Sequence, residues 1–386
     1  MYLRVFKEDF IDGVIKGTSI LAHKTGAAYL RTVWIKAEED KVKIMSTDGN
    51  LEFTGQYDAN IMESGLVGVE GKKINDLVRK LKPGEIIFRA DLNNHVCFIE
   101  QDKRKYKLAT TESSWFPELS PFPQGNSVLW SGEVFKEIIE KLLFTISDEN
   151  SLGTMTCMKI SRSSEADNEI EMCGFDMQNM GLFTIRDEDM YHLIPEMGML
   201  VAKHYMSELR KWLSPGEIEL SIDSDRFFIR KQDLSESISM PISFEEFTDY
   251  KAILSTFAGK PRSDIIINRR ELMDALERTM IFSTEMNKSA IFELKENEVR
   301  INSTAVETGE AKEVLQCRYQ GTLDQCVFNI KGLLDILARY ISEDVIMSLH
   351  GTVRPCKITG VDDPDFFVIT MPVEIKEETY YTEEVE

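Results

Sequence analysis

The chain has 386 residues, 42% of them hydrophobic, and its 66 acidic against 45 basic residues give a formal net charge of −21. This length favours two or three domains, and the apolar content excludes a globally disordered chain. No apolar run approaches the roughly 18 residues that span a bilayer, and the acidic N-terminal stretch does not resemble a signal peptide, so we expect a cytoplasmic protein with no membrane partner.

The first predicted helix is FKEDFIDGVIKGTSIL, which begins at Phe6 and carries Phe10 and Val14 at helical spacing. Short β-like runs and turns follow, including KVKIMSTDGNLEFTGQY with its Asp48-Gly49 turn signal. These runs predict antiparallel strands.

The second predicted helix lies in VEGKKINDLVRKLKPGEI, residues 69–86. Its apolar stripe is Ile74, Leu77 and Leu81, and the Pro83-Gly84 pair ends it before a further β-rich run. Its basic residues lie away from that stripe. Because an acidic surface repels DNA, any DNA contact of this protein requires such a segregated basic face.

Both helices recur. The first returns in SGEVFKEIIEKLLFTI and NRRELMDALERTMIFS, where Asn268 and Glu271 resemble a capping box. The second returns in VAKHYMSELRKWLSPGEIEL and NIKGLLDILARYISEDVIMS. A gapless alignment of this second helix gives the later apolar stripes as Met206, Leu209, Leu213 and then Leu334, Leu337, Ile341. It also places Arg79, Lys211 and Arg339 at one position.

The repeats predict three modules with the boundaries 1–123, 124–256 and 257–375, followed by an acidic tail at 376–386. Pro/Gly/Ser-rich connectors, ELSPFPQGNSV and LSTFAGKPRSD, separate them. Two amphipathic helices with antiparallel strands make each module α+β, with its helices packed on one side of the sheet.

The recurring basic helices indicate a surface that attracts phosphates without reading bases, unless they are ordinary solvated faces. The residues of this predicted DNA-facing surface are Lys72, Lys73, Arg79, Lys80, Lys203, Arg210, Lys211, Arg269, Arg270, Arg278, Lys331 and Arg339.

The six cysteines form no metal-binding spacing, so we expect reduced core thiols, no metal and no cofactor. One enzymatic alternative is metal-dependent phosphodiester chemistry at RDEDMYH, with Asp187, Glu188, Asp189 and His192. A solvated loop is the simpler interpretation, since no Walker loop, HExxH, GxSxG or CxxC motif is present.

Five stretches resemble one known family: MSTDGNLEF, VEGKKINDLVRKLKPGEI, YKLATTESSWFPEL, EEFTDYKAIL and FFVITMPVEI. In this order, and with the threefold repeat, the chain from Met1 to about Ile375 resembles the bacterial sliding clamp, the beta subunit of DNA polymerase III. The resemblance implies a non-catalytic processivity factor, a head-to-tail homodimer whose six modules form a ring around duplex DNA. It also implies partners: the clamp loader, the polymerase III catalytic subunit, and other polymerases or repair proteins with short linear motifs.

The resemblance assigns further residues. Lys24 falls where the family carries a DNA-contacting cation. Ring closure would join Tyr106 and Leu108 to Ile281 and Phe282 of the other subunit, unless these four are internal core residues.

The resemblance also implies a hydrophobic peptide-binding pocket. Its residues would be Met155, Phe175, Met177, Gln178, Asn179, Met180, Thr248, Ala252, Ile253, Ile369, Met371, Pro372, Val373, Glu374 and Ile375. Methionines suit a surface that repacks around several partners, although methionines in strands also serve as core. Asn179, Ala252 and Glu374 replace arginines common in the family. The tail KEETYYTEEVE is an addition that either stays solvated or competes for the groove. The alternative function most similar to that of a clamp is an acidic peptide-binding scaffold that never encircles DNA.

Overall fold

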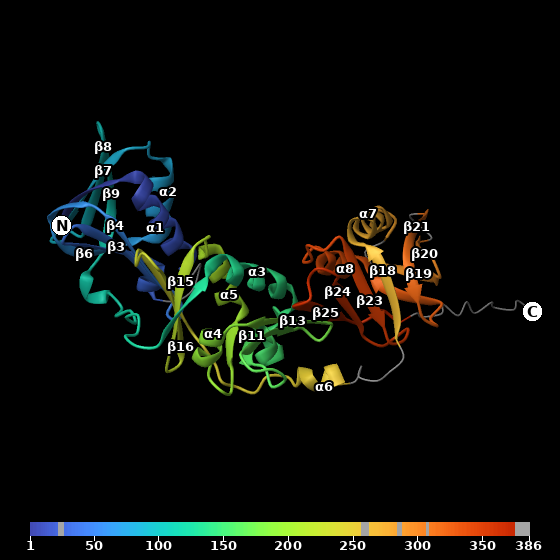
Figure 1. Ribbon diagram of the computed structural model, residues 1–386. Coiled ribbons are helices and arrows are strands. Elements are labelled where there is room, and N and C mark those ends of the chain that lie inside the picture. The colour runs from blue at the N-terminus through green and yellow to red at the C-terminus, as the bar shows by residue number, and fades with distance from the viewer. Residues whose placement is uncertain (22–26, 256–261, 284–287, 306–308, 375–386) are drawn as a thin grey trace, which may run out of the picture. The chain divides into compact units, whose positions relative to one another are not determined.

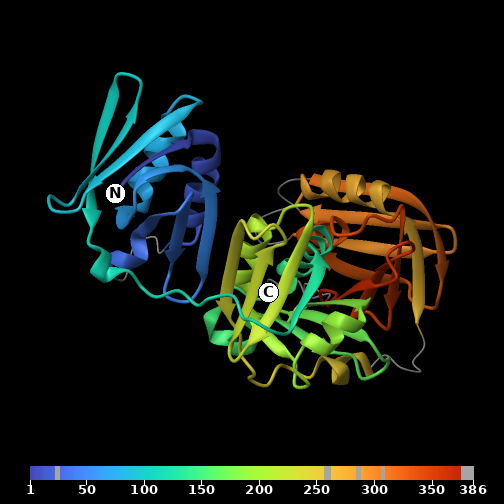
Figure 2. The same cartoon turned by 60° about the vertical axis from the view of Figure 1, so that its left-hand side comes forward.

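The computed structural model describes residues 1–21, 27–255, 262–283, 288–305 and 309–374. The chain forms two compact units. Unit 1 comprises Met1–Ile139 and Asp187–Phe244, and unit 2 comprises Glu140–Arg186 and Glu245–Glu386. Figures 1 and 2 show helices and antiparallel sheets in both units, which confirms the α+β class.

Unit 1 is built on a 13-stranded sheet. In sheet order its strands are β10 (Ser127–Ser131), β15 (Glu217–Asp223), β16 (Arg226–Lys231), β17 (Glu236–Pro241), β4 (Glu52–Asp58), β3 (Lys41–Thr47), β2 (Thr32–Glu38), β6 (Gly65–Glu70), β9 (Arg104–Thr111), β8 (Val96–Gln101), β7 (Glu85–Asp91), β1 (Tyr2–Phe6) and β5 (Asn60–Glu63).

The helices of unit 1 include α1 (Lys7–Ser19) and α2 (Gly71–Lys80), which pack on each other (Figure 1). Phe10 and Val14 of α1 are fully buried, as their spacing predicts. Gly13 lets α1 approach β4 closely, because a Cβ there would lie 2.3 Å from the Tyr57 ring. The remaining elements are η1 (Ala28–Arg31), η2 (Ser113–Trp115), α4 (Glu188–Leu193), β14 (Met199–Ala202) and α5 (Lys203–Trp212); α3 (Gly132–Leu142) crosses the boundary between the units.

In unit 2 the strand order is β11 (Cys157–Arg162), β12 (Glu169–Phe175), β13 (Asn179–Arg186), β25 (Phe366–Thr370), β24 (Cys356–Gly360), β23 (Asp344–Leu349), β18 (Ser263–Asn268), β21 (Gly309–Gln320), β20 (Glu298–Ala305), β19 (Ser289–Lys295) and β22 (Gln325–Asn329). Its helices are α6 (Tyr250–Ser255), α7 (Arg269–Met280) and α8 (Ile330–Leu337), with the 3₁₀ helices η3 (Leu143–Thr145) and η4 (Asn150–Thr156). The helices α7 and α8 pack on each other, and Asn268 caps α7 through the Glu271 amide at 3.1 Å, as predicted.

The gapless alignment of the third basic helix is wrong by one residue. The residues capping the helices α2, α5 and α8 are Glu70, Ala202 and Asn329. The buried positions four residues later are therefore Ile74, Met206 and Leu333, not Leu334. Ile341, predicted to be part of the stripe, lies beyond α8 and is 74% exposed.

Successive repeats are joined by strand pairing. The third strand after α1, β4, pairs with β17, the third strand after α5. In the same way β13, the third strand after α3, pairs with β25, the third strand after α8. One rule therefore joins both pairs of neighbouring repeats.

Each of these joints also holds an ion pair with a buried carboxylate. Lys16 of α1 lies 2.8 Å from the Glu236 carboxylate of β17. Lys141 of α3 lies 2.9 Å from Asp363, just before β25. Lys16 and Lys141 each follow the aligned Phe10 and Phe135 by six residues, so the repeat reuses one lysine position.

All six cysteines are free, four buried and two half-buried, as expected of core thiols. Within the described residues, no helix is both long and apolar enough to cross a bilayer.

Candidate nucleic-acid and peptide interfaces

The helix α2 carries its cations on an exposed face. Lys72, Arg79 and Lys80 are exposed, whereas Ile74 and Val78 are buried. Arg79 Nε donates to Asn75 Oδ1 at 2.9 Å, and Lys73 pairs with Glu70 at 2.7 Å. In the described part of the chain Lys72 and Lys80 have no ion-pair partner, so their charges are available to a phosphate.

The cations of the corresponding helix α5 are less available to a phosphate than those of α2. Lys211 is exposed but pairs with Glu208 at 2.6 Å, and Lys203 and Arg210 are half-buried. The first turn of α5 also presents an exposed His204. The density of unpaired cations is therefore highest on α2.

The arginines of α7 have different surroundings. Arg269 Nε donates to the Ser342 carbonyl at 2.8 Å and its Nη1 to the Leu337 carbonyl at 3.4 Å, so this residue ties α7 to the end of α8. Arg278 makes a bidentate ion pair with Glu313, at 2.9 and 2.8 Å, which lowers the pKa of the Glu313 carboxyl. Arg270 is exposed on the same helix.

Arg339 does not share a position with Arg79 and Lys211, which contradicts the predicted alignment. It lies beyond the end of α8, half-buried, with its guanidinium 5.4 Å from the Phe144 ring centroid. Ala338 takes the aligned position, nine residues after the capping residue. Lys331, in the first turn of α8, is exposed. Lys24 lies outside the described residues.

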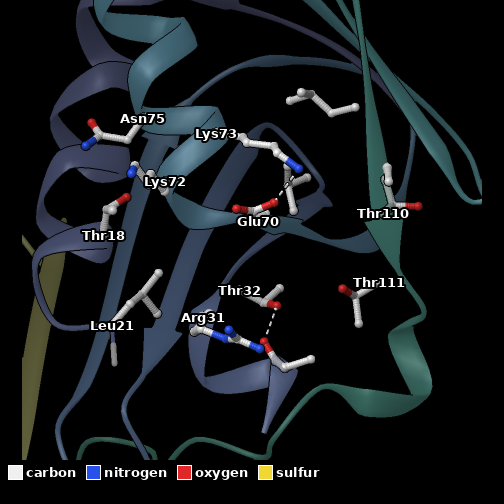
Figure 3. A pocket seen from close by; sticks show the side chains of 14 residues that line it. Thr18, Leu21, Arg31, Thr32, Glu70, Lys72, Lys73, Asn75, Thr110 and Thr111 are labelled. Carbon is white, nitrogen blue, oxygen red and sulfur yellow. Dashed lines mark hydrogen bonds and ion pairs between the residues drawn. The ribbon is translucent and has the colours of Figure 1, made fainter. Parts of the chain in front are cut away.

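A cavity of about 970 Å³ opens between α1, α2 and β9 in unit 1 (Figure 3). Lys72 and Lys73 line it on the α2 side, and Leu108, from the predicted ring-closure set, lines it on β9. Arg31 lines it as well (Figure 3). The sequence reasoning missed Arg31, because it lies in the 3₁₀ turn η1 and belongs to no repeated motif.

The four predicted ring-closure residues are not core residues of the single chain. Tyr106 and Leu108 are half-buried on β9, and Phe282 is half-buried after α7. Ile281 is 74% exposed, which is the largest exposed fraction of any large apolar side chain that the structure describes and is equalled by Ile341.

The predicted peptide pocket divides into two groups. Met177, Met371 and Val373 are exposed, at 58%, 43% and 37%. Met180 and Ile369 are opposite each other on β13 and β25 and are only 1% and 4% exposed. These two are core residues in this structure, so a peptide would have to displace a neighbour to reach them.

The other described residues of the predicted pocket, all in unit 2, differ in their exposure. Exposed are Gln178, Ala252 and Glu374; half-buried are Met155, Phe175, Asn179, Thr248 and Ile253; Pro372 is buried. Two backbone hydrogen bonds hold the strand end: the Met371 amide donates to the Gln178 carbonyl at 3.2 Å, and the Val373 amide to the Val327 carbonyl at 2.8 Å. Ile375 lies outside the described residues.

The acidic run proposed for metal chemistry has a structural role. Asp187 caps α4, its carboxylate accepting the Met190 amide at 2.8 Å. The run therefore forms a short helix and not the solvated loop that the sequence favoured. Among the residues that the structure describes, no group of three or more His, Cys, Asp or Glu side chains could hold a metal ion.

Two family models match parts of the chain. Residues 1–120 match the DNA polymerase III beta subunit, N-terminal domain, and residues 256–374 match the C-terminal domain of the same subunit. The beta sliding clamp of Haemophilus influenzae is 20% identical over 381 residues, covering 97% of this chain and all of that protein. The clamp of Pseudomonas aeruginosa is 21% identical over 384 residues, again with 97% of this chain and all of the relative covered.

Among solved structures, the Bartonella birtlesii sliding clamp bound to griselimycin has a TM-score of 0.89 at 21% identity. The Bacillus subtilis clamp has a TM-score of 0.89 at 16% identity. Each alignment covers 97% of this chain and 100% of the other. These likenesses establish the DNA-clamp fold. The chain belongs to the DNA polymerase III beta subunit family, the bacterial sliding clamps.

Proposed function

We propose that this chain is a processivity factor of DNA replication, a non-catalytic ring-shaped homodimer that encircles duplex DNA and tethers polymerases. The observation that carries the ring is the strand pairing between repeats. Two of the three kinds of joint that a ring requires are closed within the chain, by β4 with β17 and by β13 with β25. The three modules take the boundaries 1–123, 124–256 and 257–375.

The third joint is open. By the same rule it would pair β21, the third strand after α7, with β9, the third strand after α2. Over residues 309–316 β21 pairs with β20 alone, and over residues 104–109 β9 pairs with β8 alone, as far as the described residues go. Each strand therefore has a free edge, which a second copy of the chain can pair in a head-to-tail dimer.

Charge and shape support this pairing. The exposed positions of β9 include Arg104, Lys105 and Lys107, whereas the open part of β21 carries Glu310, Lys312 and Glu313, the last paired with Arg278. The exposed Ile281 requires an apolar partner, and the cavity beside Leu108 supplies one. Repulsion between the basic residues of two β9 edges favours the head-to-tail arrangement over pairing of like edges.

The exposed side chains of Met177, between β12 and β13, and of Met371 and Val373, after β25, are proposed to anchor short linear peptides of partner proteins. These partners are the clamp loader, the polymerase III catalytic subunit, and other polymerases and repair proteins. The structures of relatives bound to griselimycin support a ligand-binding surface on clamps of this family. If the ring is loaded for replication of the chromosome, we expect the loaded protein at the nucleoid.

The test is topological. Loaded by an active clamp loader with ATP onto nicked circular DNA, the dimer should remain bound through gel filtration at a salt concentration that abolishes its binding to short linear duplex. A single cut of the circle should release it, because a ring slides off a free end. Retention after linearisation, or a monomeric mass in solution, would favour the peptide-binding scaffold.

A further inference from the structure

A cationic hollow of about 410 Å³ lies on the sheet of unit 2 and has no role in the proposed ring. It is lined by Arg262, Arg318 and Lys357, together with Asp264, Ser348 and Thr359. Lys357 is opposite Ser348, and Ser348 is opposite Asp264, so one row of side chains crosses three strands. The residues alternating with this row, such as Ile265, Met347 and Ile358, are buried. The hollow therefore occupies the sheet face opposite the core.

The charges of the hollow are not balanced. Among the described residues, Asp264 is the one carboxylate that lines the hollow. It already forms an ion pair with Arg262 at 2.9 Å and accepts a hydrogen bond from the Ser348 hydroxyl at 2.7 Å. Arg318 and Lys357 have no ion-pair partner in the described part of the chain. An acidic protein thus holds three cations around one concave site, with an excess of two positive charges.

Lys357 is poorly solvated for an unpaired lysine. It is half-buried, and its Nζ lies 3.9 Å from the Phe367 ring centroid. Burial, and then the neighbouring Arg262 charge, lower the pKa of its ammonium group. An anion seated in the hollow would relieve both effects, because it would replace the lost water and offset the like charge.

We propose that this hollow is the docking site of the chain's own acidic C-terminal segment, residues 376–386. The segment KEETYYTEEVE has five glutamates against one lysine, so its charge complements the hollow. Its two adjacent tyrosines, Tyr380 and Tyr381, suit contacts with guanidinium groups. The proposal does not depend on ring formation or on the peptide-binding function.

The chain is long enough for this contact. Lys357 is the register partner of Ile369, and the described chain ends five residues later, at Glu374. Five residues span at most about 18 Å and paired strands lie about 5 Å apart, so Glu374 lies within about 23 Å of Lys357. The remaining residues, 375–386, reach about 40 Å when extended. The segment can therefore cross the hollow from its point of attachment.

The first experiment adds the labelled peptide KEETYYTEEVE to the chain truncated after residue 375 and follows binding by fluorescence anisotropy at low salt. The double substitution Arg318→Gln and Lys357→Gln should weaken binding at least about tenfold, because two charge-assisted contacts are lost. The control, Lys312→Gln, removes an exposed lysine of β21 that does not line the hollow. A peptide with its five glutamates replaced by glutamine should not bind.

The second experiment uses the full chain. Carbodiimide treatment should join Lys357 to a tail glutamate within one molecule, detected by mass spectrometry, and Arg318→Gln should reduce the yield of that product. Cross-links from the tail to other lysines without Lys357, or equal peptide binding by the double variant, would overturn the proposal. So would inorganic phosphate or a short DNA oligonucleotide that binds the hollow equally well with and without the tail, because the tail would then not be its occupant.

Discussion

At the scale of single residues, the buried pair of Lys141 and Asp363 concentrates many interactions. Both side chains are almost inaccessible, and Asp363 also accepts hydrogen bonds from the Ser342 hydroxyl at 2.7 Å and the Ser342 and Ile341 amides at 3.0 and 3.1 Å. A buried pair adds little net stability over an apolar substitute, but removing one partner leaves the other charged in a low dielectric. The contact thus fixes how the second and third repeats join.

We predict that Asp363→Asn lowers the free energy of unfolding by about 3 kcal/mol, because the buried Lys141 charge would lose the Asp363 carboxylate. Urea unfolding followed by circular dichroism measures the change. The control, Asp362→Asn, alters an exposed neighbouring carboxylate and should shift stability by less than about 0.5 kcal/mol. Equal effects of the two substitutions would show that the pair is not the cause.

The same pair predicts a pH dependence. Burial alone would raise the pKa of the Asp363 carboxyl, but hydrogen bonds from Ser342 and Lys141 outweigh burial and lower it. A lowered folded-state pKa contributes stability above the unfolded value of about 3.9, and that contribution is lost as pH falls through the folded pKa. The stability difference between the wild type and Asp363→Asn should therefore be constant from about pH 5 to 8 and shrink below about pH 4. A difference that shrinks already between pH 5 and 8 would contradict this assignment.

The peptide site gives a second prediction at residue scale. Met371→Lys should weaken a partner peptide by about 2 kcal/mol, because a few contacts carry most of the binding energy in such sites. Isothermal titration calorimetry measures the loss. Since Met371 is 43% exposed, the substitution should leave the fold and the dimer intact. Unchanged affinity would place the peptide site elsewhere.

At the scale of helices and strands, local periodicity correctly predicted the buried helix positions, because these depend on residues that are near in the sequence. Phe135, Leu272 and Leu276 are fully buried or nearly so, as helical spacing requires. The predicted alignment of the third basic helix is off by one residue because its cap, Asn329, comes one position earlier than the repeat implies. The apolar residues of IKGLLDIL fit either register. Capping, more than periodicity, set that register.

The strand-borne pocket was harder to predict. Met177 lies in the turn between β12 and β13 with a positive φ of 77°, and is exposed, whereas Met180 is buried three residues later. Which side chain of a strand reaches solvent depends on the strand beside it, here β25, nearly 190 positions away in the sequence. The pair Lys141–Asp363, whose partners are 222 positions apart in the sequence, was unpredictable for the same reason.

The open strand edges make a prediction about assembly. Leu108→Glu and Ile281→Glu should each convert the dimer to monomer, because a carboxylate would be desolvated in the apolar contact. Sedimentation velocity distinguishes the two states. The control, Leu129→Glu, changes a leucine that is already 54% exposed on β10. Monomers from the control, or dimers from both test variants, would contradict the β9–β21 joint.

At the scale of the whole molecule, a net charge of −21 must coexist with DNA. The structure separates basic residues from the acidic surface only in part. Lys72, Lys80 and Lys331 are exposed on helices, whereas Lys73, Lys211 and Arg278 are paired with carboxylates and Arg269 is committed to a helix end. Few free cations cannot hold DNA tightly by counter-ion release, so retention must come from ring closure and not from affinity.

We therefore expect that substitution of Lys72, Lys80 and Lys331 by glutamate changes the rate of loading onto DNA but not the rate of dissociation from it. Loading onto nicked circular DNA should slow by about tenfold or more, because attraction of the duplex into the ring is electrostatic. The lifetime on the uncut circle should be unchanged, since a closed ring cannot dissociate by weakening its contacts. Single-molecule fluorescence with a labelled clamp measures both quantities at several salt concentrations.

The matched control reverses three lysines borne by strands, Lys36, Lys43 and Lys295, which gives the same net charge. If net charge alone governed loading, the control would load as slowly as the helix variant. If helix contacts governed retention, the helix variant would leave the uncut circle faster than the control. We expect the helix variant alone to load slowly, and we expect its lifetime on the uncut circle to equal that of the control. A basic helix face inside a closed ring requires this result, because the face guides the duplex into the ring while topology alone holds it there.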